Sequence, residues 1–160
     1  MRVGQVRAAR PVGCRIRGCK ERGEWAELAF MARAAKEGLR VSKPHRDSAR
    51  YDVVVEYGGR FLRVQVKSTM YRRRGVESYS LNVLGPGRKK YRPGSVDLFA
   101  IYLIPRDEWY IIPFGAVGRT RSSLHFTPGG KRARYERYRE AWELLKPGSE
   151  GEVGLQSLGR

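Results

Sequence analysis

The chain has 160 residues, which is enough for one domain with a modest core. Its 33 lysines and arginines against 16 acidic residues give a formal net charge of +17 at pH 7. Self-repulsion at this charge opposes compaction, so a polyanionic partner is expected, and nucleic acid is favoured because phosphate contacts release counterions. A membrane is disfavoured, because no apolar run approaches the roughly 20 residues of a span and no basic helix has a wide apolar face.

Residues 1–19 are rich in glycine and arginine without periodicity, which predicts a flexible basic arm. This arm lacks the apolar stretch of a secretory signal, so the cytoplasm is the expected compartment. Two cysteines, Cys14 and Cys19, lie here, and together with His45 and His125 they form an alternative zinc set. A single C-x4-C pair is weak support for a metal, and the other interpretation is two ordinary thiols without a disulfide.

Apolar residues at helical spacing predict a first helix over residues 20–39, with Gly38 as its end signal. Its buried stripe is expected to consist of Trp25, Leu28, Ala29, Ala32, Ala35 and Leu39. Residues 39–45 predict a strand that is interrupted near Pro44.

The next two segments predict a β-hairpin. Residues 50–57 alternate, with Tyr51, Val53, Val55 and Tyr57 on one face, and residues 60–69 return with Leu62, Val64 and Val66 sharing a face. Gly58 and Gly59 between them are typical of a two-residue turn that needs positive φ. Such a turn fixes the register, so position 57 faces 60, position 55 faces 62 and position 52 faces 65.

The remaining chain alternates between basic loops and apolar segments. Basic loops are predicted over residues 70–80 and 85–95, and strands over 80–84, 97–104, 108–114 and, as an added edge, 124–126. Residues 131–145 predict an amphipathic helix that buries Tyr135, Tyr138, Trp142 and Leu145. The tail from residue 147 is expected to be disordered. The order of elements indicates one α/β domain over residues 20–146, a mixed β-sheet flanked by helices.

The hairpin register brings three polar side chains to one corner. Asp52 and Gln65 become cross-strand neighbours with Cβ atoms about 5 Å apart, and Lys67 projects from the same face because strand side chains have period two. A carboxylate and an amide oxygen suit Mg²⁺, and the carbonyl of Val66 is a further donor. A lysine beside them can orient water or stabilise charge on a phosphate. The corner therefore predicts metal-dependent phosphodiester hydrolysis.

Together with the first helix, these motifs resemble the PD-(D/E)XK nuclease superfamily. The pattern is Gly23-x-x-x-Glu27 on the helix, Tyr51-Asp52 on a strand and Val64-Gln65-Val66-Lys67-Ser68-Thr69 after the turn. The Gln-x-Lys variant is similar to the branch of group I intron-associated homing endonucleases and Holliday-junction-resolvase-like enzymes. The resemblance covers about residues 20–115.

The resemblance implies a restriction-endonuclease-like fold and a set of roles. The catalytic residues would be Glu27, Asp52, Gln65 and Lys67, and the metal ligands Asp52, Gln65, Val66 and Glu27. Glu24, one turn earlier on the helix, is the rival of Glu27. The implied cofactor is Mg²⁺, with Mn²⁺ as a substitute, and the implied assembly is a homo-oligomer, a dimer or higher, acting on double-stranded or branched DNA.

DNA contact is expected from the two basic loops and from two hydroxyls after the lysine, namely Arg72, Arg73, Arg74, Arg88, Lys89, Lys90, Ser68 and Thr69. The sequence leaves two roles open for the tyrosines in these loops, contact with nucleic acid or packing in the core: Tyr71, Tyr79 and Tyr91. Site-specific double-strand cleavage of the homing type is the favoured function, and a Holliday-junction or structure-specific resolvase is the nearest alternative. A non-catalytic basic nucleic-acid-binding protein is the rival from another class, although it has no reason to gather carboxylates that repel phosphate.

Overall fold

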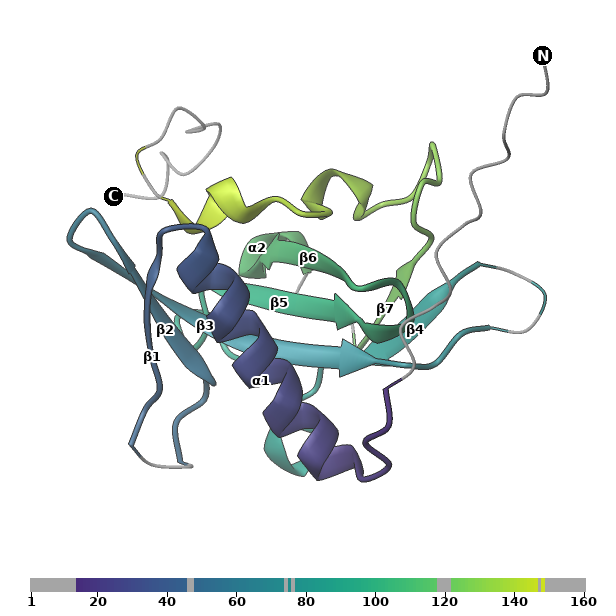
Figure 1. Cartoon of the computed structure of the whole chain (residues 1–160), viewed down its shortest axis with the longest axis horizontal. Helices are drawn as coiled ribbons and strands as arrows, with labels where there is room; N and C mark the ends of the chain where they lie inside the picture. Colours follow the sequence, from purple (N-terminus) through teal and green to yellow (C-terminus); the bar gives the residue numbers. More distant parts are fainter. Residues whose placement is uncertain are drawn as a thin grey trace, which may run out of the picture.

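The computed structural model describes residues 14–45, 48–73, 75, 77–117, 122–146 and 148. A five-stranded mixed sheet carries a long helix on one face and a small two-stranded sheet on the other (Figure 1). Arg74, residues 1–13 of the predicted arm and nearly all of the predicted tail lie outside the described residues.

The main sheet has the strand order β1-β2-β3-β5-β6, in which β3 and β5 are parallel and the other neighbours antiparallel. Its strands are β1 (Arg40–Ser42), β2 (Val53–Tyr57), β3 (Arg60–Thr69), β5 (Leu98–Leu103) and β6 (Glu108–Pro113). The small sheet pairs β4 (Tyr79–Asn82) with β7 (Ser123–Phe126), and the helices are α1 (Cys19–Lys36) and α2 (Phe114–Val117). Four 3-10 turns complete the described elements: η1 (Pro86–Arg88), η2 (Ile104–Arg106), η3 (Glu136–Tyr138) and η4 (Trp142–Leu145). No helix in these ranges is long and apolar enough to cross a membrane.

The predicted hairpin is present in its predicted register. Gly58 and Gly59 have φ values of 57° and 77°, which the two-residue turn requires at both positions. Tyr57 pairs with Arg60 and Val55 with Leu62. The register is stable because a slip of one residue would turn the buried valines of both strands out of the core.

Helix α1 buries a different stripe from the predicted one. Ala26, Phe30 and Ala34 are buried against the sheet, whereas Leu28 is 60% exposed. Of the remaining predicted stripe, Leu39 is buried, Trp25 and Ala29 are partly buried, and Ala32 and Ala35 are exposed. The alanine-rich helix offers overlapping stripes, and the orientation is set by Phe30, whose ring lies 5.6 Å from that of Trp109 and 5.7 Å from that of Trp142.

The predicted helix over residues 131–145 is wrong. This segment consists of turns with η3 and η4, and Glu140 adopts a left-handed φ of 51°. The cause is the open edge of β6: the Glu140 N–H donates to the carbonyl of Trp109 (2.8 Å), and Arg139 forms a bridge with Tyr110. The expected burial of Tyr135, Trp142 and Leu145 is confirmed, whereas Tyr138 is only partly buried, so the apolar pattern was informative while its periodicity was misleading. The edge strand expected at 124–126 is β7, which joins β4 instead of the main sheet.

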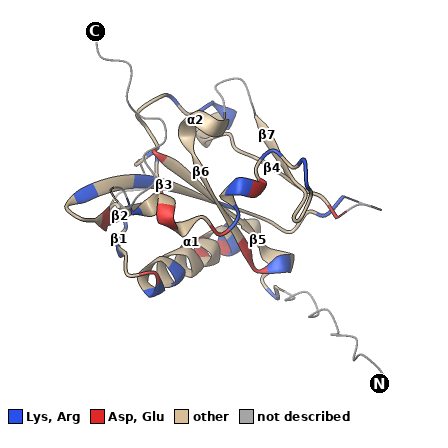
Figure 2. Cartoon of the chain, turned by 90° about the horizontal axis from the view of Figure 1, so that it is seen from above, with Lys and Arg blue, Asp and Glu red and all other residues tan. Residues whose placement is uncertain are grey.

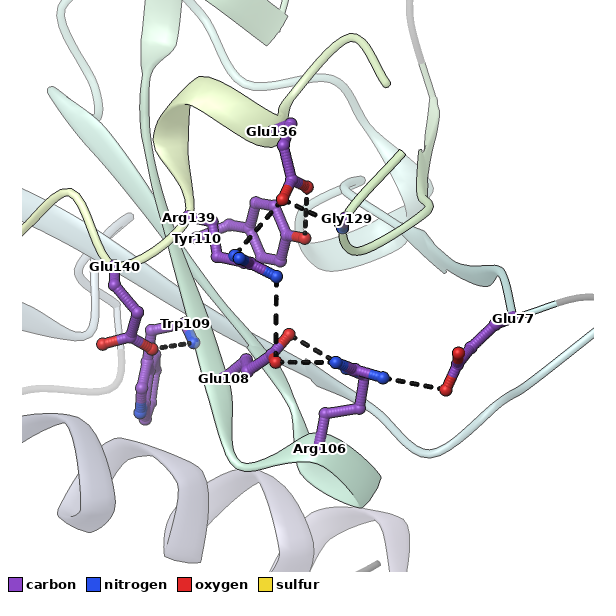
Figure 3. A network of polar contacts seen from close by, with 9 residues as sticks. All are labelled: Glu77, Arg106, Glu108, Trp109, Tyr110, Gly129, Glu136, Arg139 and Glu140. Atoms are coloured by element: carbon purple, nitrogen blue, oxygen red, sulfur yellow. Dashed lines mark hydrogen bonds and ion pairs between the residues drawn. The ribbon is translucent and has the colours of Figure 1, made fainter. Parts of the chain in front are cut away.

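Charged side chains fasten this C-terminal segment to β6 (Figure 3). Arg106 binds Glu77 (2.8 Å) and Glu108 (2.9 Å), and Arg139 lies 4.0 Å from Glu108 and 3.3 Å from Glu136. The β6 network is defined here as these five residues together with Glu140. In it the carboxylate of Glu136 also accepts hydrogen bonds from Gly129 and Tyr110, and that of Glu140 accepts the N–H of Trp109.

Candidate active site

The polar corner predicted from the hairpin lies where β2 begins. The Asp52 N–H donates to the carbonyl of Val64 (3.0 Å), which extends the hairpin pairing by one residue. Its Oδ2 atom accepts the N–H of Val66 (2.9 Å) and a hydrogen bond from the Gln65 amide. The Gln65 side chain is buried, at 7% exposure. Asp52, Gln65 and the backbone of Val66 are therefore in direct contact, and the amide nitrogen of Gln65, rather than its oxygen, faces the carboxylate.

Lys67 lies on the same face of β3 as Gln65. In the parallel pairing with β5, Gln65 is opposite Phe99 and Lys67 is opposite Ile101, both in the core beneath the small sheet. The Lys67 ammonium donates to the carbonyl of Leu84, 3.3 Å away, in the loop that follows β4. Burial lowers the pKa of Lys67, and the charge of Asp52 acts in the opposite direction. The lysine thus sits between the carboxylate and a loop.

Glu27 lies on α1, the helix on the opposite face of the sheet, and its charge acts on Asp52. Its Oε2 atom is 2.6 Å from the ammonium of Lys43, which follows β1. The charge of Glu27 raises the pKa of Asp52, whereas Glu24 is exposed and is not among the main influences on that carboxyl. Of the two rival helix acids, Glu27 is therefore the one whose charge acts on Asp52.

Asp52 is an acid whose charge is poorly compensated. Its pKa is raised from 3.8 to about 6: burial raises it most, the Val66 N–H lowers it, the charge of Glu27 raises it, and the charges of Lys67 and Lys43 lower it. Two carboxylates at one partly buried place favour a bound cation. The oxygens at hand, from Glu27, Asp52, the Gln65 amide and the Val66 carbonyl, are the donors that Mg²⁺ prefers, so the residues fit the implied metal.

The alternative zinc set does not form. Both cysteines are free thiols, and no group of three or more His, Cys, Asp or Glu side chains gathers as a metal site anywhere in the described part of the chain. Because an amide, Gln65, stands beside Asp52, the polar corner has fewer carboxylates than such a group would need.

The residues expected to contact DNA differ in their availability. Arg72, Arg73, Arg88 and Lys89 are exposed, and Lys90 belongs to the same exposed turn. Lysines and arginines recur on the hairpin, on α1 and around β4 (Figure 2). Ser68 is half-buried, and Thr69 is buried with its hydroxyl donating to Ser80 and accepting from Tyr71. The Thr69 hydroxyl is therefore occupied within the fold rather than available to a phosphate.

Two further residues lie near the site, and the sequence assigned neither of them to it. Lys43 was not singled out, although extending the β1–β2 register beyond the Ser42–Val54 pair brings it beside the start of β2. Tyr91 is half-buried with its ring 5.3 Å from that of Phe99. Burial and then the charge of Asp52 raise its pKa to about 12, so this tyrosine lies in the neighbourhood of the acid. Of the other two tyrosines, Tyr79 is core and Tyr71 is exposed.

Comparison with known proteins agrees with this geometry. Residues 18–145 match the family model described as PD-(D/E)XK endonuclease. The bacterial homing endonuclease I-Ssp6803I is similar at 29% identity, with 81% of this chain and 92% of that chain covered and a TM-score of 0.65. A Holliday junction resolvase from Archaeoglobus fulgidus shares the fold at 16% identity, with coverage of 78% and 95% and a TM-score of 0.50. None of the curated proteins compared with the chain matched it.

The match spans α1, the hairpin, the closing strands and the C-terminal segment, and the similar structures share the mixed sheet. The expected restriction-endonuclease-like α/β fold is confirmed by this likeness. The chain belongs to the PD-(D/E)XK endonuclease family.

Proposed function

We propose that this protein is a metal-dependent DNA endonuclease of the homing type, which hydrolyses phosphodiester bonds at the polar corner of Glu27, Asp52, Gln65 and Lys67. The observation that carries the proposal is the half-buried carboxylate of Asp52, which is bonded to the Gln65 amide and the Val66 N–H and whose pKa is raised to about 6, first by burial and then by the charge of Glu27. The chain has a net charge of +17, so a pair of acids within it indicates a binding site for a cation that acts on a phosphate group.

The proposed ligands are Asp52, the amide oxygen of Gln65 and the carbonyl of Val66, with Glu27 binding directly or through water. When bound, Mg²⁺, or Mn²⁺ in its place, supplies a Lewis acid that polarises the phosphate and lowers the pKa of a coordinated water. Gln65 presents its amide oxygen to the same point as Asp52 only after its side-chain amide turns over. The charge of the cation then replaces the hydrogen bond that Gln65 now donates to Asp52.

Lys67 supplies positive charge to the reacting phosphate. Its stem is partly buried and its ammonium is held 3.3 Å from the Leu84 carbonyl, so it is oriented before substrate arrives. Charge in such a partly desolvated place acts more strongly than charge in water. We therefore assign Lys67 to the stabilisation of negative charge on the phosphate and to the orientation of the attacking water.

DNA binding is assigned to the exposed cations that flank the corner, with Ser68 as a further contact: Arg72, Arg73, Arg88, Lys89 and Lys90. Each phosphate that these side chains neutralise adds salt-sensitive affinity without sequence preference. Cleavage of both strands of a duplex requires two active sites, so we propose that the protein works as a homo-oligomer, a dimer or higher.

A Holliday-junction resolvase is the second candidate, supported by the fold it shares with the archaeal resolvase. The homing type is favoured because the bacterial homing endonuclease is nearly twice as similar in sequence. The non-catalytic binder is disfavoured, because the carboxylates of Glu27 and Asp52 would only weaken its hold on phosphate.

The test incubates the protein with supercoiled plasmid, a four-way junction and a library of random sites, with Mg²⁺ or with chelator. Wild type should cut only with the metal, and Lys67→Ala should cut about 10² to 10³ times more slowly. Lys36→Ala removes an exposed lysine from the end of α1 and should cut as wild type does. Cutting of the junction alone would establish the resolvase, and salt-sensitive binding without any cutting would reject the nuclease.

A further inference from the structure

Lys43 makes an ion pair that places a cation at the polar corner. Its ammonium lies 2.6 Å from Oε2 of Glu27, with the two side chains 45% and 21% exposed. The two residues are 16 positions apart, and Lys43 directly follows β1 whereas Glu27 lies in the middle of α1. The pair therefore joins the sheet edge to the helix at the acid proposed to face the metal.

This pair differs from an ordinary surface ion pair in the number of acids around it. The hydrogen bond to Glu27 raises the pKa of Lys43 against a smaller effect of burial, and the charges of Glu27, Asp52 and Glu24 raise it further. Lys43 in turn lowers the pKa of Asp52. The ammonium is thus in contact with Glu27, and its charge acts on Asp52, the two acids between which a divalent cation is proposed to bind.

The neighbouring pair between Arg40 and Glu56 shows the contrast. It lies on the same β1–β2 edge, its closest atoms are 3.7 Å apart and the arginine is 83% exposed. Arg40 is not among the charges that influence Asp52. Both residues carry one positive charge at one end of the three-residue strand β1, so Arg40 is a matched control for Lys43.

We propose that Lys43 is a stand-in cation, which neutralises Glu27 in the metal-free protein and leaves when a divalent cation enters. The inference rests on the proposed function, since it takes Glu27 to face the metal. An oxygen that accepts a short hydrogen bond from an ammonium has its charge already engaged, and two cations at one carboxylate repel each other. The lysine can depart because its stem is flexible and nearly half of its side chain reaches solvent.

The stand-in has two consequences for the site. It relieves the repulsion between Glu27 and Asp52 while no metal is bound, so the corner keeps its geometry. It also competes with the metal, so the affinity for Mg²⁺ is lower than the ligands alone would give. Lys43 acts through Glu27 and is accordingly a positioning residue rather than a catalytic one.

The first measurement is calorimetric titration of DNA-free protein with Mg²⁺. Lys43→Gln should bind the ion about three- to tenfold more tightly than wild type, because the competing ion pair and the repulsion are gone. The Mg²⁺ affinity of Arg40→Gln should stay within about twofold of wild type, and this variant controls for the general effect of losing one positive charge. The proposal would be overturned if Lys43→Gln bound Mg²⁺ no more tightly than wild type, or if Arg40→Gln gained as much affinity as Lys43→Gln.

The second measurement is thermal unfolding with chelator and with saturating Mg²⁺. In chelator, Lys43→Gln should melt about 1 to 3 °C below wild type, because Glu27 and Asp52 then repel without relief. In Mg²⁺ the difference should vanish or reverse. A deficit of the same size in both conditions would make the pair purely structural and reject the proposal.

Asp52→Asn separates this inference from the proposed function. If wild type binds Mg²⁺ and Asp52→Asn does not, the metal site stands whatever Lys43 does. If wild type binds no Mg²⁺ at all, the proposed function fails, and the stand-in fails with it.

Discussion

The β6 network and the polar corner are built from the same kinds of side chain but balance their charges differently. In the network, Arg106 lies between Glu77 and Glu108, and Arg139 between Glu108 and Glu136 (Figure 3). In the corner, the half-buried carboxylate of Asp52 is bonded to an amide and a backbone N–H instead of a guanidinium. Burial is the largest cause that raises its pKa, to about 6, and no guanidinium is among the charges that lower it.

The difference separates a scaffold from a site. Paired charges and satisfied N–H groups lower the free energy of the fold, so the β6 network holds the C-terminal segment on the open strand edge. A buried acid with little compensation raises that free energy, and such groups are typical of functional positions. Substitutions in the network should therefore reduce stability, whereas removal of the Asp52 charge from the corner should reduce activity and leave stability equal or higher.

The largest expected loss of stability comes from Glu140→Ala in the β6 network. The Glu140 carboxylate accepts the Trp109 N–H (2.7 Å) and the Trp142 indole N–H (2.8 Å), and it pairs with Arg33 (3.1 Å). Removing it leaves buried donors without their acceptor, so the free energy of unfolding should fall by about 2 to 4 kcal/mol. Chemical denaturation followed by tryptophan fluorescence measures this loss.

The control for this variant is Glu143→Ala, which removes an exposed acid from the same segment. Its effect should stay within about 0.5 kcal/mol. Glu140→Ala should also retain wild-type cleavage at temperatures where it is folded. A stable Glu140→Ala protein that has lost cleavage would contradict the separation between scaffold and site.

The same contrast explains how far the sequence predicted this molecule. The hairpin was predictable because Gly58 and Gly59 fix its turn and the alternating valines fix its register, and both are local signals. The contact between Asp52 and Gln65 followed from that register. The position of Lys43 did not, because β1 is only three residues long and its pairing with β2 carries no turn signal of its own.

The C-terminal segment shows the opposite case. Its aromatic spacing predicted a helix, yet the segment pairs with β6 because that edge offers hydrogen bonds that a helix would leave unused. The prediction of the buried stripe on α1 was wrong for a related reason. The choice among the possible alanine stripes depends on the two tryptophans against which Phe30 packs. In both cases the deciding partner is distant in sequence, where periodicity carries no information.

The next effect concerns pH and the acid of the polar corner. A carboxyl whose pKa rises from 3.8 to about 6 on folding opposes folding when ionised, by up to about 3 kcal/mol above pH 6. This penalty shrinks as the pH falls towards about 4, where both states bind the proton. In chelator, Asp52→Asn should therefore be more stable than wild type at pH 8, with the advantage fading by pH 4, as measured by urea unfolding at each pH.

Asp97 provides a control of opposite sign. Burial acts to raise its pKa, but the hydrogen bonds and charge of Arg63 outweigh burial and lower it. A lowered carboxyl pKa means stability that is present at neutral pH and lost in acid, so Asp97→Asn should be less stable than wild type at pH 8. If Asp52→Asn and Asp97→Asn change stability in the same direction at pH 8, the contrast between a balanced and an unbalanced acid is wrong.

The smallest expected effect comes from Gln65→Glu, which tests the glutamine that stands in place of the family's usual acidic ligand. Gln65→Glu adds a carboxylate where the neutral amide now lies, so the corner with a bound cation gains one negative charge. Mg²⁺ should bind about tenfold more tightly, which corresponds to about 1.4 kcal/mol, and the fold should remain intact because the two side chains have nearly the same shape. Calorimetry and cleavage titrated against magnesium measure the gain, with Gln65→Leu as the variant that removes the oxygen donor.

In chelator the added charge of Gln65→Glu beside Asp52 should lower stability, so the effects with and without metal should have opposite signs. Unchanged magnesium dependence in both measurements would remove Gln65 from the ligands and leave Asp52 and Glu27 to hold the cation with backbone and water.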